Sequence, residues 1–173
     1  MPKSSAALLQ RSSRATVAAG FVSGMLAGLA ARPGNSPLIA RLLAEAGVPD
    51  TVLIDPAERI AVASYADLYN RLAGELGDET FGLFAAPMRP GSFEFLCRSV
   101  ITAATLAEAL DRAARFLHLV LPDLKVKIEC PKSGPALLSF TLDKASPLAR
   151  RAPADPARVF AFEWLLRLLH ALL

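Results

Sequence analysis

The apolar residues of this chain change their spacing near residue 121, and that change constrains the fold more than any other feature. Before it, apolar residues recur at intervals of three and four, as on one face of an α-helix. Beyond it, every second residue from Leu124 to Cys130 is apolar, with charged residues in between. This alternation is typical of a β-strand with one buried face. The chain must therefore combine helices with strands.

A second alternating segment predicts a β-hairpin. Leu138, Phe140 and Leu142 alternate with polar residues, and a loop rich in Pro and Gly separates them from the first strand. Two strands alone are marginal in water, so the hairpin must pack on helices or pair with further strands, such as one near Ile60. We predict an α+β fold, predominantly helical, with a small antiparallel β-sheet that includes at least one hairpin at about residues 124–142.

Helix start and stop signals are well marked from residue 36 onward. Ser36 and Pro37 have the residue types of an N-cap and a first helical position, and Gly47 ends that helix. Ser64 is the expected cap of a helix that ends at Gly77. Three further helices are expected to begin at Ser92, at a Thr105–Glu108 capping box and at Asp155.

The amino-terminal part of the chain allows two interpretations. Residues 1–14 are predicted to be a basic, flexible arm, and residues 15–173 have the size of a single domain. The uncharged stretch Ala15–Ala31 is either a first core helix or a secretory signal or membrane segment. It is shorter than the ~20 residues that a membrane span needs, which favours the helix. Its glycines recur every four residues and mark one helix face for close packing: Gly20, Gly24 and Gly28.

The charge is unevenly distributed. The formal net charge of +3 comes from 19 Lys and Arg against 16 Asp and Glu, and residues 1–32 hold four of the basic residues and no acid. The remainder is close to neutral, which argues against tight nucleic-acid binding by this chain. Two cysteines are too few for a disulfide-built scaffold and suit a reducing compartment.

No segment predicts catalysis or metal binding. Gly20–Gly24 differs by one position from the nucleophile elbow of serine hydrolases. The residues of zinc-binding type are Cys97, His118, Cys130 and His170. None of them forms a close pair with the spacing of zinc ligands. His118 shares a helix face with Asp111 and Arg115, which is typical of a solvated helix edge. We predict a protein that is not an enzyme and has neither cofactor nor metal.

Aromatic and sulfur-containing residues accompany arginines between residues 81 and 98. Small-molecule sites are usually apolar with one or two polar anchors, and an arginine can pair with a carboxylate. The alternative is plain core packing, with Arg89 and Arg98 at the surface. The candidate ligand-binding residues are Phe81, Phe84, Met88, Phe95, Cys97 and Arg98. Arg98 is the preferred anchor, because it lies three residues after Phe95 and shares its helix face.

The order of several short motifs indicates a family. These motifs are Gly47-Val48-Pro49, Asp55-Pro56, Arg59-Ile60, Leu76-Gly77-Asp78, Phe81-Gly82-Leu83, Pro90-Gly91-Ser92-Phe93 and Thr105–Leu110. Together with the helix between Tyr65 and Leu76, they resemble the amino-terminal effector-binding domain of AraC-type transcriptional regulators, of the branch labelled arabinose-binding-like. The match runs from about Val17 to the end. It implies a helix-rich α+β domain rather than a cupin barrel.

The resemblance implies a function as well as a fold. It indicates a ligand-sensing and potentially dimerising regulatory domain of a cytoplasmic bacterial transcription factor, which binds a small effector that is apolar or bears a carboxylate. It implies no membrane partner and no ligand residue that can be transferred by position. Such regulators contact DNA through a C-terminal helix-turn-helix domain, which this sequence lacks, and Leu173 ends the last helix without a C-cap. We therefore expect the sensor half of a longer regulator.

Two alternatives from other classes remain open at this point. One is a small hydrolase or lipid-handling enzyme that uses residues 81–98, and the other is an oligomerisation module without a ligand. An enzyme needs a nucleophile or an acid and base placed in a cleft, whereas a sensor needs only a pocket. The geometry of the pocket therefore discriminates between them.

The charge distribution predicts that this chain alone does not bind DNA with sequence specificity. The part beyond residue 32 is nearly neutral, so it lacks the cationic face that phosphate contacts require. A mobility-shift titration at physiological salt should show no specific complex. Retention of one promoter fragment at nanomolar protein concentration would contradict this expectation.

Overall fold

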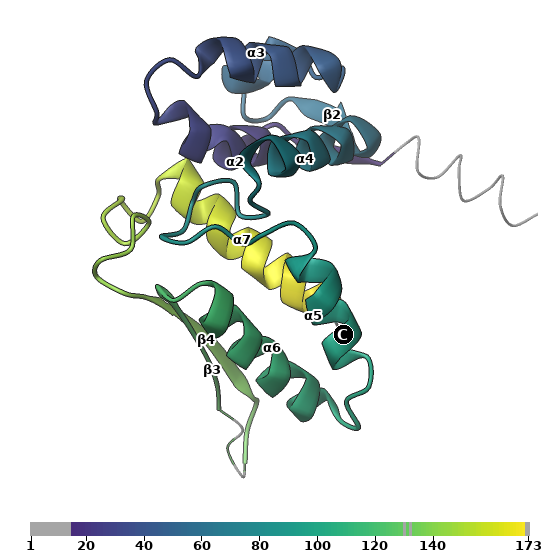
Figure 1. The fold of residues 1–173 in the computed structure, drawn as a ribbon, viewed down its shortest axis with the longest axis vertical. Coiled ribbons are helices and arrows are strands. Elements are labelled where there is room, and N and C mark those ends of the chain that lie inside the picture. The colour runs from purple at the N-terminus through teal and green to yellow at the C-terminus, as the bar shows by residue number, and fades with distance from the viewer. Residues whose placement is uncertain (1–14, 130, 132, 172–173) are drawn as a thin grey trace, which may run out of the picture.

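The computed structural model describes residues 15–129, 131 and 133–171, and within them it contains six α-helices and two small antiparallel sheets (Figure 1). This confirms the predicted α+β class with a helical majority. In chain order the elements are β1 (Thr16–Ala18), α2 (Gly20–Ala30), α3 (Ser36–Glu45), the 3-10 helix Asp50–Leu53, β2 (Arg59–Ala61), α4 (Val62–Leu76), α5 (Ser92–Val100), α6 (Leu106–Val120), β3 (Leu124–Glu129), β4 (Leu137–Leu142) and α7 (Pro156–Ala171). The predicted arm at residues 1–14, Cys130 and Leu172–Leu173 lie outside the described residues.

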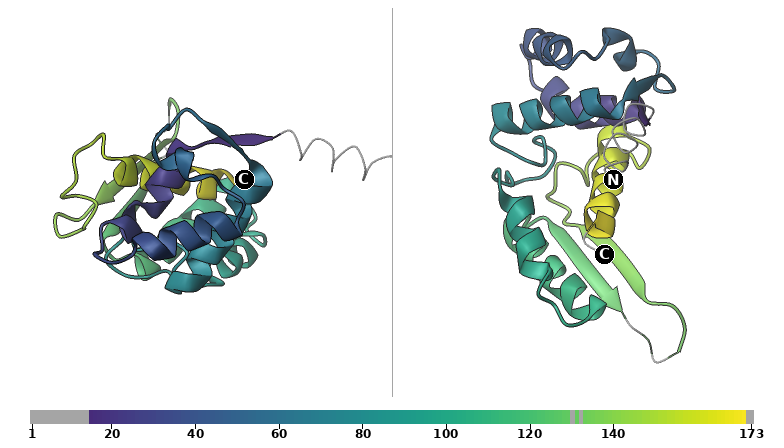
Figure 2. Two further views of the ribbon diagram at one scale, coloured as in Figure 1. Left: turned by 90° about the horizontal axis from the view of Figure 1, so that it is seen from above. Right: turned by 90° about the vertical axis from the view of Figure 1, so that its right-hand side faces the viewer.

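Helix α7 joins two groups of elements. Figures 1 and 2 show α2, α3 and α4 with β2 at one end of the molecule, and α5, α6 and the β3–β4 hairpin at the other. Helix α2 packs along α7, and α5 and the hairpin both pack on α6. One hydrophobic core runs through both groups, and seven buried residues of α7 contribute to it. The last helix in the sequence is thus the central one in space.

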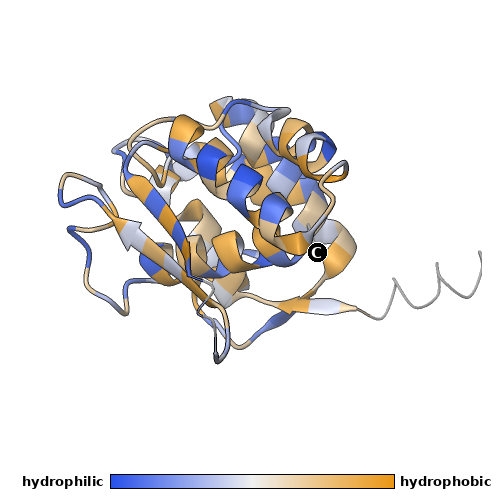
Figure 3. Cartoon of the chain, turned by 90° about the horizontal axis from the view of Figure 1, so that it is seen from below, coloured by the Kyte–Doolittle hydropathy of each residue, from blue (hydrophilic) through white to orange (hydrophobic). Residues whose placement is uncertain are grey.

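The predicted hairpin is confirmed, and its register places the apolar residues on one face. Val126 lies opposite Phe140, and Ile128 lies opposite Leu138. The alternation of hydrophobic and hydrophilic residues along the strands is visible in Figure 3. The hairpin was expected either to pack on helices or to pair with further strands, and it packs on helices. It lies on α6, and the Phe140 ring is 6.4 Å from that of Phe162 on α7.

The strand near Ile60 exists, but it belongs to a separate sheet. Ile60 of β2 pairs with Val17 of β1, a strand that lies within the stretch favoured as the first helix. Helix α2 begins only at Gly20, so the assignment of the whole Ala15–Ala31 stretch to a helix is wrong at its start. The β-branched residues Thr16 and Val17 favour an extended backbone, and β2 supplies the hydrogen-bond partners. Among the described residues, no helix is both long and apolar enough to span a bilayer.

The predicted helix starts are only partly correct. The Thr105 half of the capping box is confirmed, because the backbone N–H of Glu108 donates to Oγ1 of Thr105 at 3.1 Å. The Glu108 carboxylate reaches one residue beyond the cap and accepts from the N–H of Ala104 at 3.0 Å. Ser36 and Ser92 are not caps but the first residues of their helices. The N-cap positions belong to Asn35 and Gly91, and neither makes a side-chain cap hydrogen bond.

The assignment of Ser64 as a cap is also wrong. Helix α4 begins two residues earlier, at Val62, and its N-cap residue Ala61 has no side-chain cap. The backbone N–H of Val62 donates instead to the carbonyl of Ala15, beside β1. The carbonyl of Ala15 thus satisfies one of the free N–H groups at the start of α4.

The glycine-marked face of α2 is confirmed as a place of close approach. A Cβ atom at Gly24 would lie 2.5 Å from Cβ of Phe160 and 2.9 Å from the carbonyl oxygen of Pro156, both on α7. A Cβ atom at Gly28 would lie 2.5 Å from the carbonyl oxygen of Phe81. At Gly20 the nearest atoms are 3.6 Å away or more, an ordinary contact distance. Gly24 and Gly28 therefore set the closeness of α2 to α7 and to the loop after α4.

Gly24→Ala should destabilise the protein by about 1–3 kcal/mol, because the added methyl group has to displace backbone and Cβ atoms of α7. Gly74→Ala is the matched control, since this helical glycine has no atom within 4 Å of a built Cβ. Better helix propensity should make that variant about 0.5–1 kcal/mol more stable. Urea denaturation followed by circular dichroism measures both changes. Equal effects of the two substitutions would contradict the close packing of α2 on α7.

Candidate ligand-binding site

The structure does not bring the six predicted ligand-binding residues together. Those six are Phe81, Phe84, Met88, Phe95, Cys97 and Arg98. The first three are buried in the hydrophobic core, and Cys97 is half-buried. Phe95 is 64% exposed, and the exposed guanidinium of Arg98 forms an ion pair with Glu94 at 2.6 Å. Arg98 and Phe95 do share the outer face of α5, but no described pocket includes either of them.

An aromatic pocket lies instead where α4, α5 and α7 meet. Its volume is about 230 Å³. It is lined by Tyr65, Tyr69, Phe93, Trp164, Arg167, Leu168 and Ala171. A site with aromatic walls and a single cation was expected within residues 81–98. Of that segment, only Phe93 lines this pocket. An apolar pocket with few polar groups is the usual form of a small-molecule site.

Helical spacing explains how these residues meet. Tyr65 and Tyr69 lie one turn apart on α4, and Trp164, Arg167 and Leu168 lie three and four residues apart on α7. The sequence signals were present as a helical stripe and as the only tryptophan of the chain. A single sequence does not show which two helices face each other, so these residues were missed.

Phe93 is held in the pocket by the start of α5. The carboxylate of Glu79 accepts hydrogen bonds from the backbone N–H of Gly91 at 2.7 Å and from that of Phe93 at 2.9 Å. A carboxylate at this end of a helix satisfies free N–H groups and interacts favourably with the helix dipole. The loop after α4 thereby fixes the third wall of the pocket.

The hydroxyl groups of the pocket are protonated at neutral pH. Burial raises the pKa of Tyr65 to about 12, since the phenolate would lose its hydration. Burial is also the main cause that raises the pKa of Tyr69. Nε1–H of Trp164 donates to the Tyr69 hydroxyl oxygen at 3.2 Å, which leaves the proton of that hydroxyl for another acceptor.

Arg167 supplies the positive charge of the pocket. Its guanidinium lies over the Phe21 ring of α2, 4.3 Å from the ring centroid. In the part of the chain that the structure describes, Arg167 forms no ion pair with a carboxylate. Glu163, one turn earlier on α7, lines a different hollow between α2 and α7. A cation stacked on a ring keeps the N–H groups at its edge available.

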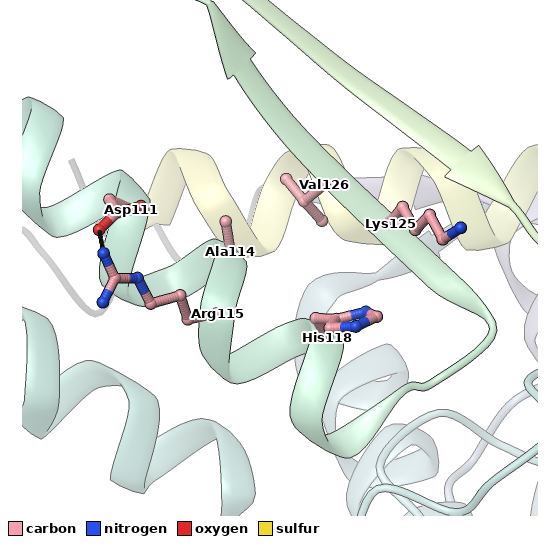
Figure 4. A pocket seen from close by; sticks show the side chains of 6 residues that line it. All are labelled: Asp111, Ala114, Arg115, His118, Lys125 and Val126. Atoms are coloured by element: carbon pink, nitrogen blue, oxygen red, sulfur yellow. Dashed lines mark ion pairs between the residues drawn. The ribbon is translucent and has the colours of Figure 1, made fainter.

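A second hollow, of about 330 Å³, lies between α6 and β3 (Figure 4). Asp111, Arg115 and His118 reach it from α6, and Lys125 and Val126 from β3. Asp111 pairs with Arg115 at 2.7 Å, and the Arg115 side chain is 80% exposed. This arrangement is the solvated helix edge that the sequence predicted for His118. Across residues 15–129, 131 and 133–171, no group of three His, Cys, Asp or Glu side chains is placed to hold a metal ion.

Comparison with known proteins identifies the family. The sequence matches the family model of the N-terminal arabinose-binding domain of AraC transcription regulators over residues 39–173. The chain therefore belongs to this family, as its motifs suggested, and it is a ligand-sensing regulatory domain of an AraC-type regulator. No curated protein and no solved structure gave a match.

The tyrosines of the pocket should make stability depend on pH in the alkaline range. The pKa of Tyr65 is about 12 in the folded state and 10 when unperturbed, so its contribution is fully present below pH 10 and is lost as the pH rises toward 12. Tyr65→Phe should flatten this decline in the free energy of unfolding. Absorbance titration of the phenolates is direct, because Tyr65 and Tyr69 are the only two tyrosines. Ionisation of both at the ordinary pKa would contradict the burial argument.

Proposed function

We propose that this domain binds a small, largely apolar effector in the pocket between α4, α5 and α7, as part of a cytoplasmic transcription factor. The observation that carries the proposal is the aromatic lining with one cation, situated beside the helix that joins both ends of the molecule. DNA contact through a separate C-terminal domain and formation of a homodimer belong to the same proposal. Membership of the family supports both, and the pocket does not bear on them.

The position of the pocket supports sensing. Its walls come from α4 in one group of elements, from α5 in the other and from α7 between them. A ligand in it contacts all three helices at once, and burying its apolar surface yields about 25 cal/mol per Å². Such a ligand favours whichever arrangement of the three helices it binds more tightly, and this difference in affinity is the physical basis of a ligand-controlled switch.

The chemistry of the lining supports binding over catalysis. The lining residues are four aromatics, one arginine, one leucine and one alanine. The set contains neither a serine or cysteine nucleophile nor a histidine or carboxylate to act as a base. The half-buried Cys97 and the histidine of the α6–β3 hollow line other surfaces. The alternative of a small hydrolase therefore finds no support in this pocket.

Trp164 provides a direct test, because it is the only tryptophan of the chain and its ring lines the pocket. Titration with a neutral apolar probe, 3-phenylpropanamide, should change the tryptophan fluorescence in a saturable way and raise the melting temperature. Ala171→Phe should weaken this binding at least roughly tenfold, since the added ring occupies the pocket.

Ala114→Phe is the matched control, because Ala114 lines the separate hollow on α6. This variant should bind the probe as the wild type does. A fluorescence change that Ala171→Phe leaves intact would place the site elsewhere. The absence of any response of Trp164 in the wild type would contradict the proposed function.

A further inference from the structure

Each polar side chain that lines the pocket can donate a hydrogen bond. At neutral pH the Tyr65 and Tyr69 hydroxyls carry their protons, and the Arg167 guanidinium has only N–H groups. The indole N–H of Trp164 is already bonded to Tyr69. No side-chain carboxylate or amide lines the pocket to accept a hydrogen bond from a ligand. A ligand that uses the Arg167 and hydroxyl donors together must bring acceptors of its own.

The position of Arg167 indicates the charge of the ligand as well as its hydrogen-bonding groups. Of the eleven other arginines in the described chain, six are paired with carboxylates: Arg41, Arg71, Arg98, Arg112, Arg115 and Arg151. Arg167 instead rests on the Phe21 ring at 4.3 Å. This contact leaves the guanidinium charge unneutralised, and the edge of a guanidinium matches a carboxylate in bidentate geometry. An amine in the same place would meet a like charge.

The size of the pocket limits the ligand. About 230 Å³ is less than the roughly 300–1,000 Å³ of typical small-molecule pockets. The walls are ring faces and edges, against which another ring packs in offset or edge-on contact. The space therefore suits one ring with a short side chain, and it excludes dinucleotides and long acyl chains.

We propose that the effector of this pocket is a monocyclic aromatic or similarly apolar carboxylate, whose anionic group is bound by Arg167 with the Tyr65 and Tyr69 hydroxyls as further donors. This inference rests on the proposed function, since it names the chemical class of the ligand of the same pocket. It assigns the anchoring role to Arg167, whereas Arg98 is paired with Glu94 on the outer face of α5.

A matched series of three probes tests which ligand charge the pocket prefers. The probes are 3-phenylpropanoate, 3-phenylpropanamide and 3-phenylpropylamine, which share a ring and chain and differ in charge. With the full chain and Trp164 fluorescence as the readout, we expect the carboxylate to bind at least roughly tenfold more tightly than the amide. The amine should bind more weakly than the amide.

Variants separate the anchoring role from a structural one. Arg167→Gln should reduce the affinity for the carboxylate to that for the amide and leave the amide affinity unchanged. Arg98→Gln, the matched control, should leave all three affinities unchanged, because Arg98 lines no described pocket. Arg167→Lys keeps the charge and should retain part of the preference. Tyr65→Phe removes one donor and should lower the preference several-fold.

The outcomes distinguish the two proposals. Equal wild-type affinities for carboxylate and amide would overturn the anionic class and leave an apolar sensor. An Arg167→Gln variant that loses affinity for carboxylate and amide alike would show that Arg167 shapes the pocket rather than selects charge, and would also overturn the inference. If none of the three probes changed the fluorescence of Trp164, the proposed function itself would be contradicted.

Discussion

The buried carboxylate of Asp78 organises the loop between α4 and α5. It accepts hydrogen bonds from the backbone N–H and the hydroxyl of Thr80 and from the N–H groups of Gly82 and Met88, at 2.7–2.9 Å. Hydrogen bonds to a charged group contribute about 1.5–3 kcal/mol each. Phe81 within this loop has a φ of +59°, a conformation that costs a bulky residue about 1–3 kcal/mol. These hydrogen bonds fix the backbone on both sides of Phe81 and so hold it in a conformation it would otherwise avoid.

The placement of Phe81 explains why a pocket exists beside it. Its fully buried ring meets Tyr69 edge-on at 4.7 Å and lies 6.0 Å from the Phe160 ring, so it holds α4 and α7 at a fixed separation. The next acidic residue in the loop, Glu79, holds the start of α5. The separation of α4 and α7 and the position of the Phe93 wall thus depend on two carboxylates, those of Asp78 and Glu79. Neither residue lines the aromatic pocket.

Local signals predicted the elements well, and contacts between distant segments account for what was missed. Strand alternation and the capping box involve neighbours within a few residues, so the hairpin and the start of α6 could be predicted. The start of α4 depends on the carbonyl of Ala15, just before β1 and 47 residues away from Val62. Contacts between distant segments also separate the six predicted ligand-binding residues. Residues 81–98 have the composition of a small-molecule site. The hydrogen bonds of Asp78, however, place the first part of that segment in the core, and Arg98 lies on the solvent-exposed face of α5. The cation that lines the pocket is Arg167, 69 residues further along the chain.

The two faces of α7 differ in how they are packed. On one face, α2 and α7 approach so closely at Gly24 that no space is left between them. A ligand cannot change the position of one of these helices relative to the other without breaking close contacts. Arg167, stacked on Phe21, belongs to the same pair of helices. On the other face, Phe93 comes from α5, which packs on α6 and is held to the pocket by loop hydrogen bonds. A ligand that fills the pocket therefore meets the closely packed α2–α7 pair on one side and, on the other, the helix α5 that the Glu79 carboxylate holds in place.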